Sequence, residues 1–410
     1  MKTKRVPGFM TGLSLLFPIT LSVMAALFVA PIAPKIAEAY GSTGRYTPGE
    51  LQFYIGWIIT APALCVALFS IPAGALGDKV GRRRLLIWSM ALYVVVGVMP
   101  YFLTDLKHIL WSRIAVGMVE ALLMTLSTTL IGDMFHGEAR GRWLSAQTGV
   151  ASTFAIFAIL IAGVVGARDW HNVFLLYLLP AVFLVLVLLF TWEPEETEHL
   201  HDHTLAVEGR WSDLPWGMMA LICAITLFGS VMFYTVQIKL PDALKDLGVV
   251  LPGGGYDAAR GGLMTALASL FVPVGTVCFW YLSPRLSLKA MFVVEFTLLA
   301  AGFLLMSVLK NPWAFTLAAG LDQIGAGMLL PTLLTWAVAQ LPFAVRGRGT
   351  GIWTATFSLG QFACNNLAVP FIMGFTGAIL PTLGVLGWLC AGAAALALVS
   401  PLKTPERQAA

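Results

Sequence analysis

The sequence predicts an all-α integral membrane protein, with twelve transmembrane helices in two pseudo-symmetric six-helix bundles. Of its 410 residues, 58% are hydrophobic and 11% are charged, and the mean hydropathy is +0.84. Soluble domains contain roughly 25% charged residues, so most of this surface should face lipid. Apolar stretches long enough to cross a bilayer recur along the whole chain, and the longest polar connection divides them six and six.

Each of the apolar stretches is interpreted as one membrane-spanning helix. The chain begins Met-Lys-Thr-Lys-Arg and continues with an apolar run. This run is about 24 residues, long for a signal peptide, and no small-residue cleavage site follows, so we expect it to be retained as the first span. The expected spans are 9–33, 50–76, 85–103, 108–134, 142–166, 173–192, 215–239, 261–282, 289–309, 312–341, 348–374 and 378–401.

The polar connection at 193–214 separates an N-terminal bundle, 1–192, from a C-terminal bundle, 215–410. A six-plus-six division around a charged loop is typical of transporters built from two homologous halves. The connection is acidic and contains His199, His201 and His203. Such a tract is able to bind a metal ion, but no further ligand set is visible. We therefore interpret it as a solvated linker and predict neither a metal site nor a cofactor.

The placement of the basic residues predicts the orientation. If the N-terminus lies in the cytoplasm, the cytoplasmic segments hold about twice as many Lys and Arg residues as the outer ones, as the positive-inside rule requires. Both termini should then be cytoplasmic. We expect a multi-pass protein of the cell membrane, which in a bacterium is the inner membrane, surrounded by the lipid bilayer and monomeric.

Several classes of function are excluded or disfavoured. The net charge of +4 is too small to suggest a nucleic-acid partner. No P-loop pattern occurs, so ATP should not drive the protein directly. No nucleophile–base constellation indicates an enzyme. The five cysteines lie inside apolar spans without a CxxC pair and are interpreted as small buried hydrophobes.

The stretch from Gly74 to Arg84 is the most informative in the chain. It joins two spans through Gly-Ala-Leu-Gly-Asp-Lys-Val-Gly-Arg-Arg-Arg. Glycines permit the tight turn, and the cations should hold the loop in the cytoplasm. Asp78 is left at a helix end, where an arginine or another helix N-terminus is able to pair with it. A loop of this kind can act as a latch between helices that part and rejoin.

This stretch resembles the loop between the second and third helices of the major facilitator superfamily of secondary transporters. That loop reads G-x-L-x-D-x-x-G-R-[RK], and the matching residues are Gly74, Leu76, Asp78, Gly81, Arg82 and Arg83. The alternative is a positively charged hairpin of any polytopic membrane protein. The resemblance extends over the whole chain and is weaker in the second half, where 282–289 lacks the aspartate and the glycines.

The resemblance implies two bundles around a central cavity and a charge relay at the cytoplasmic side. In the family, an acid at the end of the fourth helix pairs with the arginine of this loop. Here Asp133 holds that position, so Asp78, Arg82 and Asp133 are implied to form the relay. It would lie against the N-terminus of the eleventh helix, near Gly347–Gly351, and hold the outward-facing state closed.

Three spans carry ionisable groups well inside the membrane, and these groups are Arg113, Glu120, Glu295 and Asp322. Such groups are costly and usually face the interior of a bundle. Arg113 and Glu120 are seven residues apart and share a helix face. Arg113 also falls on the family pattern R-x-x-x-G, in which the arginine faces the cavity.

Proton coupling is predicted for three of these groups. Glu120 lies roughly 18 Å along its helix, near the centre of the membrane. Asp322 lies at a similar depth in the tenth helix, the pseudo-symmetric mate of the fourth, so the two carboxyls are able to face one cavity. We predict that Arg113, Glu120 and Asp322 couple transport to protons. The alternative is a set of neutral or arginine-paired structural carboxyls, and Glu295, near Lys289, is assigned more readily to that set.

Polar side chains within other spans are candidates for reading a substrate. Gln361 and Asn365 are spaced i, i+4 and form one polar stripe. Buried amides also link helices by hydrogen bonds, which is the alternative for each of them. The candidates for the substrate cavity are Gln147, Tyr234, Gln237, Gln361 and Asn365.

Together these features predict a secondary transporter that moves a small organic solute by alternating access. We favour proton-coupled efflux of drug-like or metabolite molecules, because the cavity should be mostly apolar with few fixed charges. The absence of a Gly-Pro pair in the fifth span and of a carboxylate in the first weakens that choice. The alternatives are a proton-coupled uptake symporter and a transport-inactive relative that serves as a receptor or scaffold. The intact Asp78, Arg82, Arg113 and Asp133 argue against the last.

Overall fold

The computed structural model describes residues 7–135, 137–193, 211–341 and 345–400. Within these ranges the chain is helical, and its only extended pairing is one antiparallel bridge between Val250 and Tyr256. Ten helices there are long and apolar enough to cross a membrane, or eleven if a pair bent by 50° near Leu21 forms one span. The predicted fold class is confirmed.

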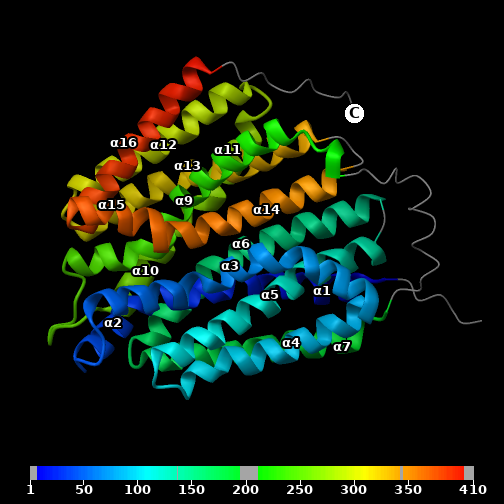
Figure 1. Ribbon diagram of the computed structural model, residues 1–410, viewed down its shortest axis with the longest axis horizontal. Helices are drawn as coiled ribbons and strands as arrows, with labels where there is room; N and C mark the ends of the chain where they lie inside the picture. Colours follow the sequence, from blue (N-terminus) through cyan, green and yellow to red (C-terminus); the bar gives the residue numbers. More distant parts are fainter. Residues whose placement is uncertain (1–6, 136, 194–210, 342–344, 401–410) are drawn as a thin grey trace, which may run out of the picture.

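The N-terminal half follows the predicted order of spans (Figure 1). The first span continues beyond the predicted boundary, through a short 3-10 turn, because prolines interrupt the helix without ending it. Its elements are α1 (Phe9–Val29), η1 (Ala30–Ile32), α2 (Ala33–Gly41), α3 (Pro48–Val80), α4 (Arg82–Val98), η2 (Met99–Tyr101), α5 (Leu106–Met134), α6 (Gly137–Gly166), η3 (Trp170–Leu178) and α7 (Leu179–Phe190).

The C-terminal half contains two broken spans. One is divided between α10 and α11, and the other contains a π-helical turn, η7. The span with the π-helical turn is not counted among the ten or eleven membrane-length helices. It is divided, and its first part is rich in polar residues. The elements are η5 (Trp211–Asp213), α9 (Trp216–Asp246), α10 (Ala258–Ser269), α11 (Phe271–Leu282), α12 (Leu288–Val308), α13 (Pro312–Gln340), α14 (Arg346–Ala363), η7 (Cys364–Ala368), α15 (Val369–Thr376) and α16 (Ile379–Val399).

Local sequence signals explain where the helices begin and end. Thr47 and Glu50 form a capping box at the start of α3, with Pro48 in the first turn. Gly81 separates α3 from α4 with φ of 98°, a conformation that favours glycine. The side chain of Asn311 caps α13 by accepting hydrogen bonds from two backbone amides. Polar capping residues therefore set boundaries that hydropathy alone does not.

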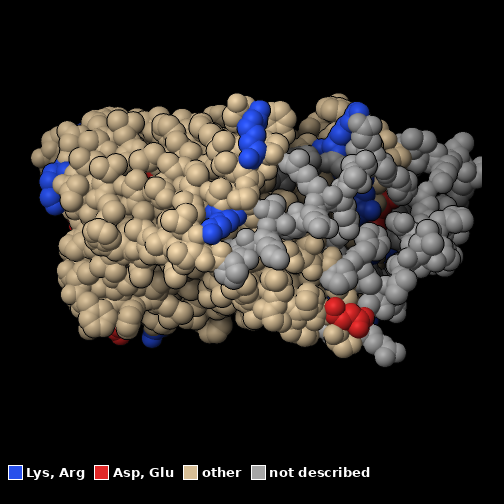
Figure 2. Space-filling model, turned by 90° about the horizontal axis from the view of Figure 1, so that it is seen from above, with Lys and Arg blue, Asp and Glu red and all other residues tan. Residues whose placement is uncertain are grey.

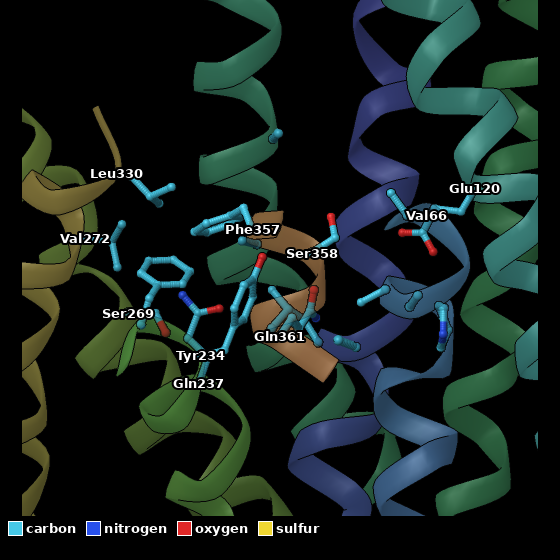
Figure 3. Close-up of a pocket in the computed structure, with 18 of the residues that line it drawn as sticks. Val66, Glu120, Tyr234, Gln237, Ser269, Val272, Leu330, Phe357, Ser358 and Gln361 are labelled. Carbon is cyan, nitrogen blue, oxygen red and sulfur yellow. The ribbon is translucent and has the colours of Figure 1, made fainter. Parts of the chain in front are cut away.

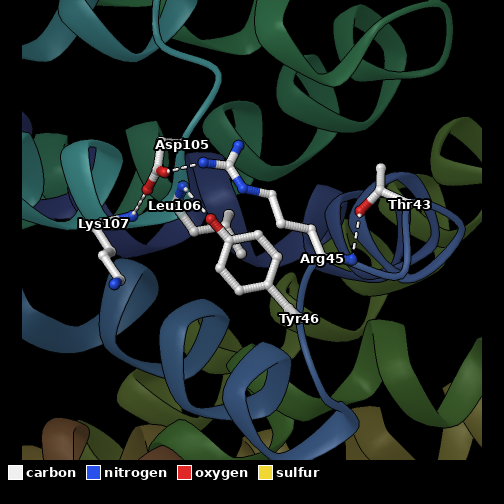
Figure 4. Close-up of polar contacts among 6 residues, drawn as sticks. All are labelled: Thr43, Arg45, Tyr46, Asp105, Leu106 and Lys107. Carbon is white, nitrogen blue, oxygen red and sulfur yellow. Dashed lines mark hydrogen bonds and ion pairs between the residues drawn. The ribbon is translucent and has the colours of Figure 1, made fainter.

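The turn between α2 and α3 is fastened to the start of α5 (Figure 4). Arg45 donates to Asp105 across 2.7 Å, and the hydroxyl of Tyr46 accepts from the amide of Leu106 at 3.4 Å. Asp105 also caps α5 by accepting from the amide of Lys107 at 2.8 Å. One carboxylate thus closes a helix end and anchors the neighbouring loop.

Each half has its own hydrophobic core, built almost wholly from its own helices. The outer surface is also apolar: Figure 2 shows a face whose described part carries few charged side chains, and Trp88, Trp280 and Trp388 are among the large exposed residues. Such a surface is suited to lipid rather than to water. We call the end of the bundle that contains Gly81 the latch end, and the end that contains Gly41 the opposite end; they lie right and left in Figure 1.

Candidate functional site

At the latch end, an ion pair joins the start of α4 to the end of α5. The guanidinium of Arg82 donates to both carboxylate oxygens of Asp133 at 2.5 Å. This is the pair that the family resemblance implies. The side chain of Asp78 lies outside the described part of the structure, as does that of Arg346, so the described part of the relay is the pair itself. The latch function stays a prediction.

The glycines of the loop differ in their surroundings. A Cβ on Gly81 would combine an unfavourable φ with a contact of 3.2 Å to Glu193, whereas one on Gly74 would make an ordinary contact of 3.7 Å with Thr125. Glu193 itself accepts hydrogen bonds from the first amides of α4, at Arg83 and Arg84. The first residue of the expected linker therefore caps the helix that follows the loop.

A cavity of about 360 Å³ lies between the two halves. Its wall in the N-terminal half comes from α1, α3, α5 and α6, and its wall in the C-terminal half comes from α9, α10, α11, α13 and α14. Most lining side chains are aliphatic or aromatic. Among the polar ones, Figure 3 labels Glu120, Tyr234, Gln237, Ser269, Ser358 and Gln361. The polar lining residues that the structure describes are Glu120, Tyr234, Gln237, Ser269, Thr354, Ser358 and Gln361.

Glu120 is the single Asp, Glu, Lys, Arg or His among the described lining residues. Its carboxylate extends from α5 toward the cavity, across from Tyr234 and Gln237 (Figure 3). The residue is 3% exposed, and its Oε2 has no hydrogen-bond partner within the described structure. A buried carboxylate oxygen without a partner is costly. Glu295 and Asp322 share this feature, so the place of Glu120 in the cavity lining is what distinguishes it from them.

The structure brings three of the five predicted substrate residues to the cavity: Tyr234, Gln237 and Gln361. Gln147 is buried outside the lining and donates to the carbonyl of Leu15 and to Ser127. This contact links α6 to α1 and α5. The structure therefore places Gln147 between helices, and its role in substrate binding stays a prediction.

Asn365 is also buried away from the lining residues. Its amide donates to the carbonyl of Gly56 at 2.9 Å, and the neighbouring Asn366 donates to the hydroxyl of Thr60. Both bonds cross from η7 in the C-terminal half to α3 in the N-terminal half. The predicted polar stripe of the eleventh span thus divides, with Gln361 at the cavity and Asn365 in the contact between the halves. Substrate binding by Asn365 remains untested.

Arg113 is fully buried inside the N-terminal half. It donates to the carbonyls of Ala25 at 2.6 Å and Ile58 at 3.3 Å, and to the hydroxyl of Tyr177 at 2.8 Å. Its guanidinium also lies 5.2 Å from the centre of the Tyr177 ring. No ion pair within 4 Å joins it to a carboxylate in the described structure, and it does not line the cavity.

Asp322 does not share the cavity with Glu120. Asp322 packs closely against α12, where a Cβ added at Gly302 would lie 2.5 Å from the Cβ of Asp322. One carboxylate oxygen accepts from Gln323 at 3.1 Å, and Gln323 in turn meets Gln237 at 3.5 Å, so a chain of amides connects it to the cavity wall. Glu295 is buried elsewhere and accepts from Thr332. Proton coupling by Asp322 stays a prediction, but the shared cavity expected for it is absent from this conformation.

At the opposite end, an ion pair between the halves forms a contact that the sequence did not suggest. Lys245 on α9 lies 2.9 Å from Glu38 on α2, and both oxygens of Glu38 accept from the backbone amide of Tyr256 at 3.1 Å. We call these three residues the clasp. Glu38 and Lys245 stand far apart in sequence and in different halves, so no spacing pattern connects them.

Replacing Glu38 by glutamine should weaken closure of the opposite end. The variant loses the charge that both Lys245 and the Tyr256 amide recognise, although this half-buried pair contributes only about 0.5–1 kcal/mol. We expect a severalfold faster reaction of a cysteine introduced at Ser269 with an impermeant thiol reagent from that side. Asp257→Asn, a nearby charge change outside the clasp, is the control; equal rates in both variants would contradict the role.

Comparison with known proteins adds independent evidence. Residues 15–252 match the model of the Major Facilitator Superfamily. The 3-(3-hydroxy-phenyl)propionate transporter of Escherichia coli is 28% identical over 367 residues, which cover 85% of each chain. The multidrug efflux pump LfrA of Mycolicibacterium smegmatis is 29% identical over 137 residues, covering 32% of this chain and 26% of that protein.

Solved structures show the same fold. A D-xylose–proton symporter superposes with a TM-score of 0.77 over 98% of this chain and 99% of its own, at 16% sequence identity. At that identity the likeness concerns the arrangement of helices alone. The arrangement of helices is therefore shared with a known membrane transporter.

Proposed function

Since this chain belongs to the Major Facilitator Superfamily, we propose that it moves a small organic solute across the cell membrane by alternating access, coupled to protons through Glu120. The chain is a multi-pass membrane transporter. In our proposal the latch end faces the cytoplasm, the protein acts as a monomer, and the direction is efflux. In a bacterium the membrane would be the inner one.

The observation that carries this proposal is the position of Glu120. It is the one acidic side chain in the described lining of the cavity between the halves, and one of its oxygens is without a partner. A carboxyl in a cavity that opens in turn to each side of the membrane is able to exchange a proton for the solute. The closed opposite end supports alternation, because its contacts must break for the cavity to open there.

The test is flux in proteoliposomes under an imposed pH gradient, with a panel of radiolabelled aromatic acids, sugars and organic cations. We expect solute to move against the inward flow of protons, and Glu120→Gln to abolish the dependence on the gradient, because the amide cannot carry a proton. Glu295→Gln, a buried carboxyl outside the cavity, is the matched control and should retain it.

Uptake together with protons is the second candidate, and a specific observation favours it. The relative that covers most of this chain among those described above is a transporter of an aromatic acid, and the superposed structure is a proton symporter. Movement of solute with the protons would establish this alternative. No flux with any of the panel would favour a receptor or scaffold instead.

A further inference from the structure

The charge of the cavity points to the chemical class of the solute. The described lining contains one carboxylate, Glu120, and no lysine, arginine or histidine. Arg113 on the same helix keeps its positive charge, because its partners are two carbonyls and a hydroxyl, but its side chain does not line the cavity. A bound anion would therefore contact the carboxylate and would meet no cation in the described lining. The electrostatics therefore oppose an anionic solute and favour a cationic one.

The rest of the wall fits an apolar body around such a charge. Phe233, Tyr234 and Phe357 form an aromatic cluster in the C-terminal half, with ring centres 4.9 to 5.9 Å apart. Two of these rings lie across the cavity from Glu120 (Figure 3). Aromatic faces attract cations and pack against flat apolar groups. A volume of about 360 Å³ is within the range of small-ligand sites.

We propose that the cavity takes a monovalent organic cation with an aromatic or apolar body, with Glu120 as its counter-ion. The proposal rests on the proposed transport function and adds the charge of its solute. The carboxylate of Glu120, with its unpartnered Oε2, lies next to the positive charge of the solute, and the aromatic cluster contacts the apolar body. Solute and proton then compete for one carboxylate, so the cation binds less tightly as the pH falls.

Other titratable groups surround Glu120 and act on its protonation. They are Arg113 on its own helix, Cys65 on α3, Tyr93 on α4, Tyr177 on η3 and Tyr234 on α9. Arg113 is the one that is cationic at neutral pH. Because Arg113 donates its hydrogen bonds to Ala25, Ile58 and Tyr177, the Oε2 of Glu120 stays available to the solute.

Binding to the purified full-length protein tests the proposal without requiring transport. The probes are benzyltrimethylammonium, its neutral carbon isostere neopentylbenzene, and 3-phenylpropionate. We expect the cation to bind roughly tenfold more tightly than either of the others, since its charge attracts the carboxylate and the aromatic faces although it donates no hydrogen bond. Glu120→Gln should weaken cation binding about tenfold and leave the neutral probe within about twofold, whereas Glu295→Gln should change neither.

The pH dependence of the unmodified protein is a second measurement that does not depend on how the variant folds. Cation binding should weaken as the pH falls and should release protons. Equal or tighter binding of the anion or the neutral isostere, no detectable cation binding, or no change in Glu120→Gln would overturn the proposal. Cation binding through Glu120 without flux would instead refute transport alone, and proton-linked flux of an anion would refute the cation class alone.

Discussion

Replacing Gly163 by valine is expected to abolish transport while leaving both halves folded. Gly163 on α6 faces Gly262 on α10, and these two helices meet across the boundary between the halves at the opposite end. A Cβ at Gly163 would lie 2.7 Å from the carbonyl oxygen of Ala258 and 2.8 Å from the Cα of Gly262. Both are backbone atoms, so no side-chain rotation relieves the overlap.

The larger side chain should therefore hold the opposite end open. We expect the initial rate of solute flux to fall at least about tenfold, since transport requires that end to close. A cysteine at Ser269 in the cavity wall should become reactive from that side. Gly149→Val on the same helix is the control, because a Cβ there has no atom within 4 Å. Full activity in Gly163→Val would show that the halves need not approach so closely.

The same contact shows why the sequence predicted the fold better than the contacts that close the opposite end. An apolar run of membrane length identifies a span with little ambiguity, so the predicted stretches correspond to the observed helices. Whether two glycines from different halves meet depends on how the bundles dock. Neither the Gly163–Gly262 contact nor the clasp of Glu38 and Lys245 leaves a local pattern in the chain.

The candidate site was predicted in part, for a related reason. Sequence position gives the depth of a residue in the membrane. Depth, together with the pseudo-symmetry of the fourth and tenth helices, suggested that Glu120 and Asp322 face one cavity. The face that each presents is set by packing, and these helices are apolar on nearly every side. Close approach of Gly302 turns Asp322 toward α12, whereas Glu120 faces the cavity. The sequence predicted a polar helix face only for Gln361 and Asn365. In the structure, Gln361 lines the cavity, whereas Asn365 donates to Gly56 in the other half.

Truncation of Arg113 to alanine is expected to lower the free energy of unfolding by about 3–5 kcal/mol, the range for removing a large buried side chain. Arg113 is fully buried and contacts three elements at once, through Ala25 of α1, Ile58 of α3 and Tyr177 of η3. Alanine removes these bonds and leaves an unfilled volume. Equilibrium unfolding in detergent by a chemical denaturant measures the loss, and a change below about 1 kcal/mol would contradict the structural part of the role.

Arg113→Met separates that structural part from the predicted role in coupling. Methionine restores most of the buried volume but not the charge, and it leaves the acceptors at Ala25, Ile58 and Tyr177 without their donor. We therefore expect Arg113→Met to unfold at a denaturant concentration between those of Arg113→Ala and the unmodified protein. If its flux nevertheless no longer responds to the pH gradient, the guanidinium is retained for the proton equilibrium of Glu120, two helical turns away on the same helix. If the response is unchanged, Arg113 holds α1, α3 and η3 together and takes no part in coupling.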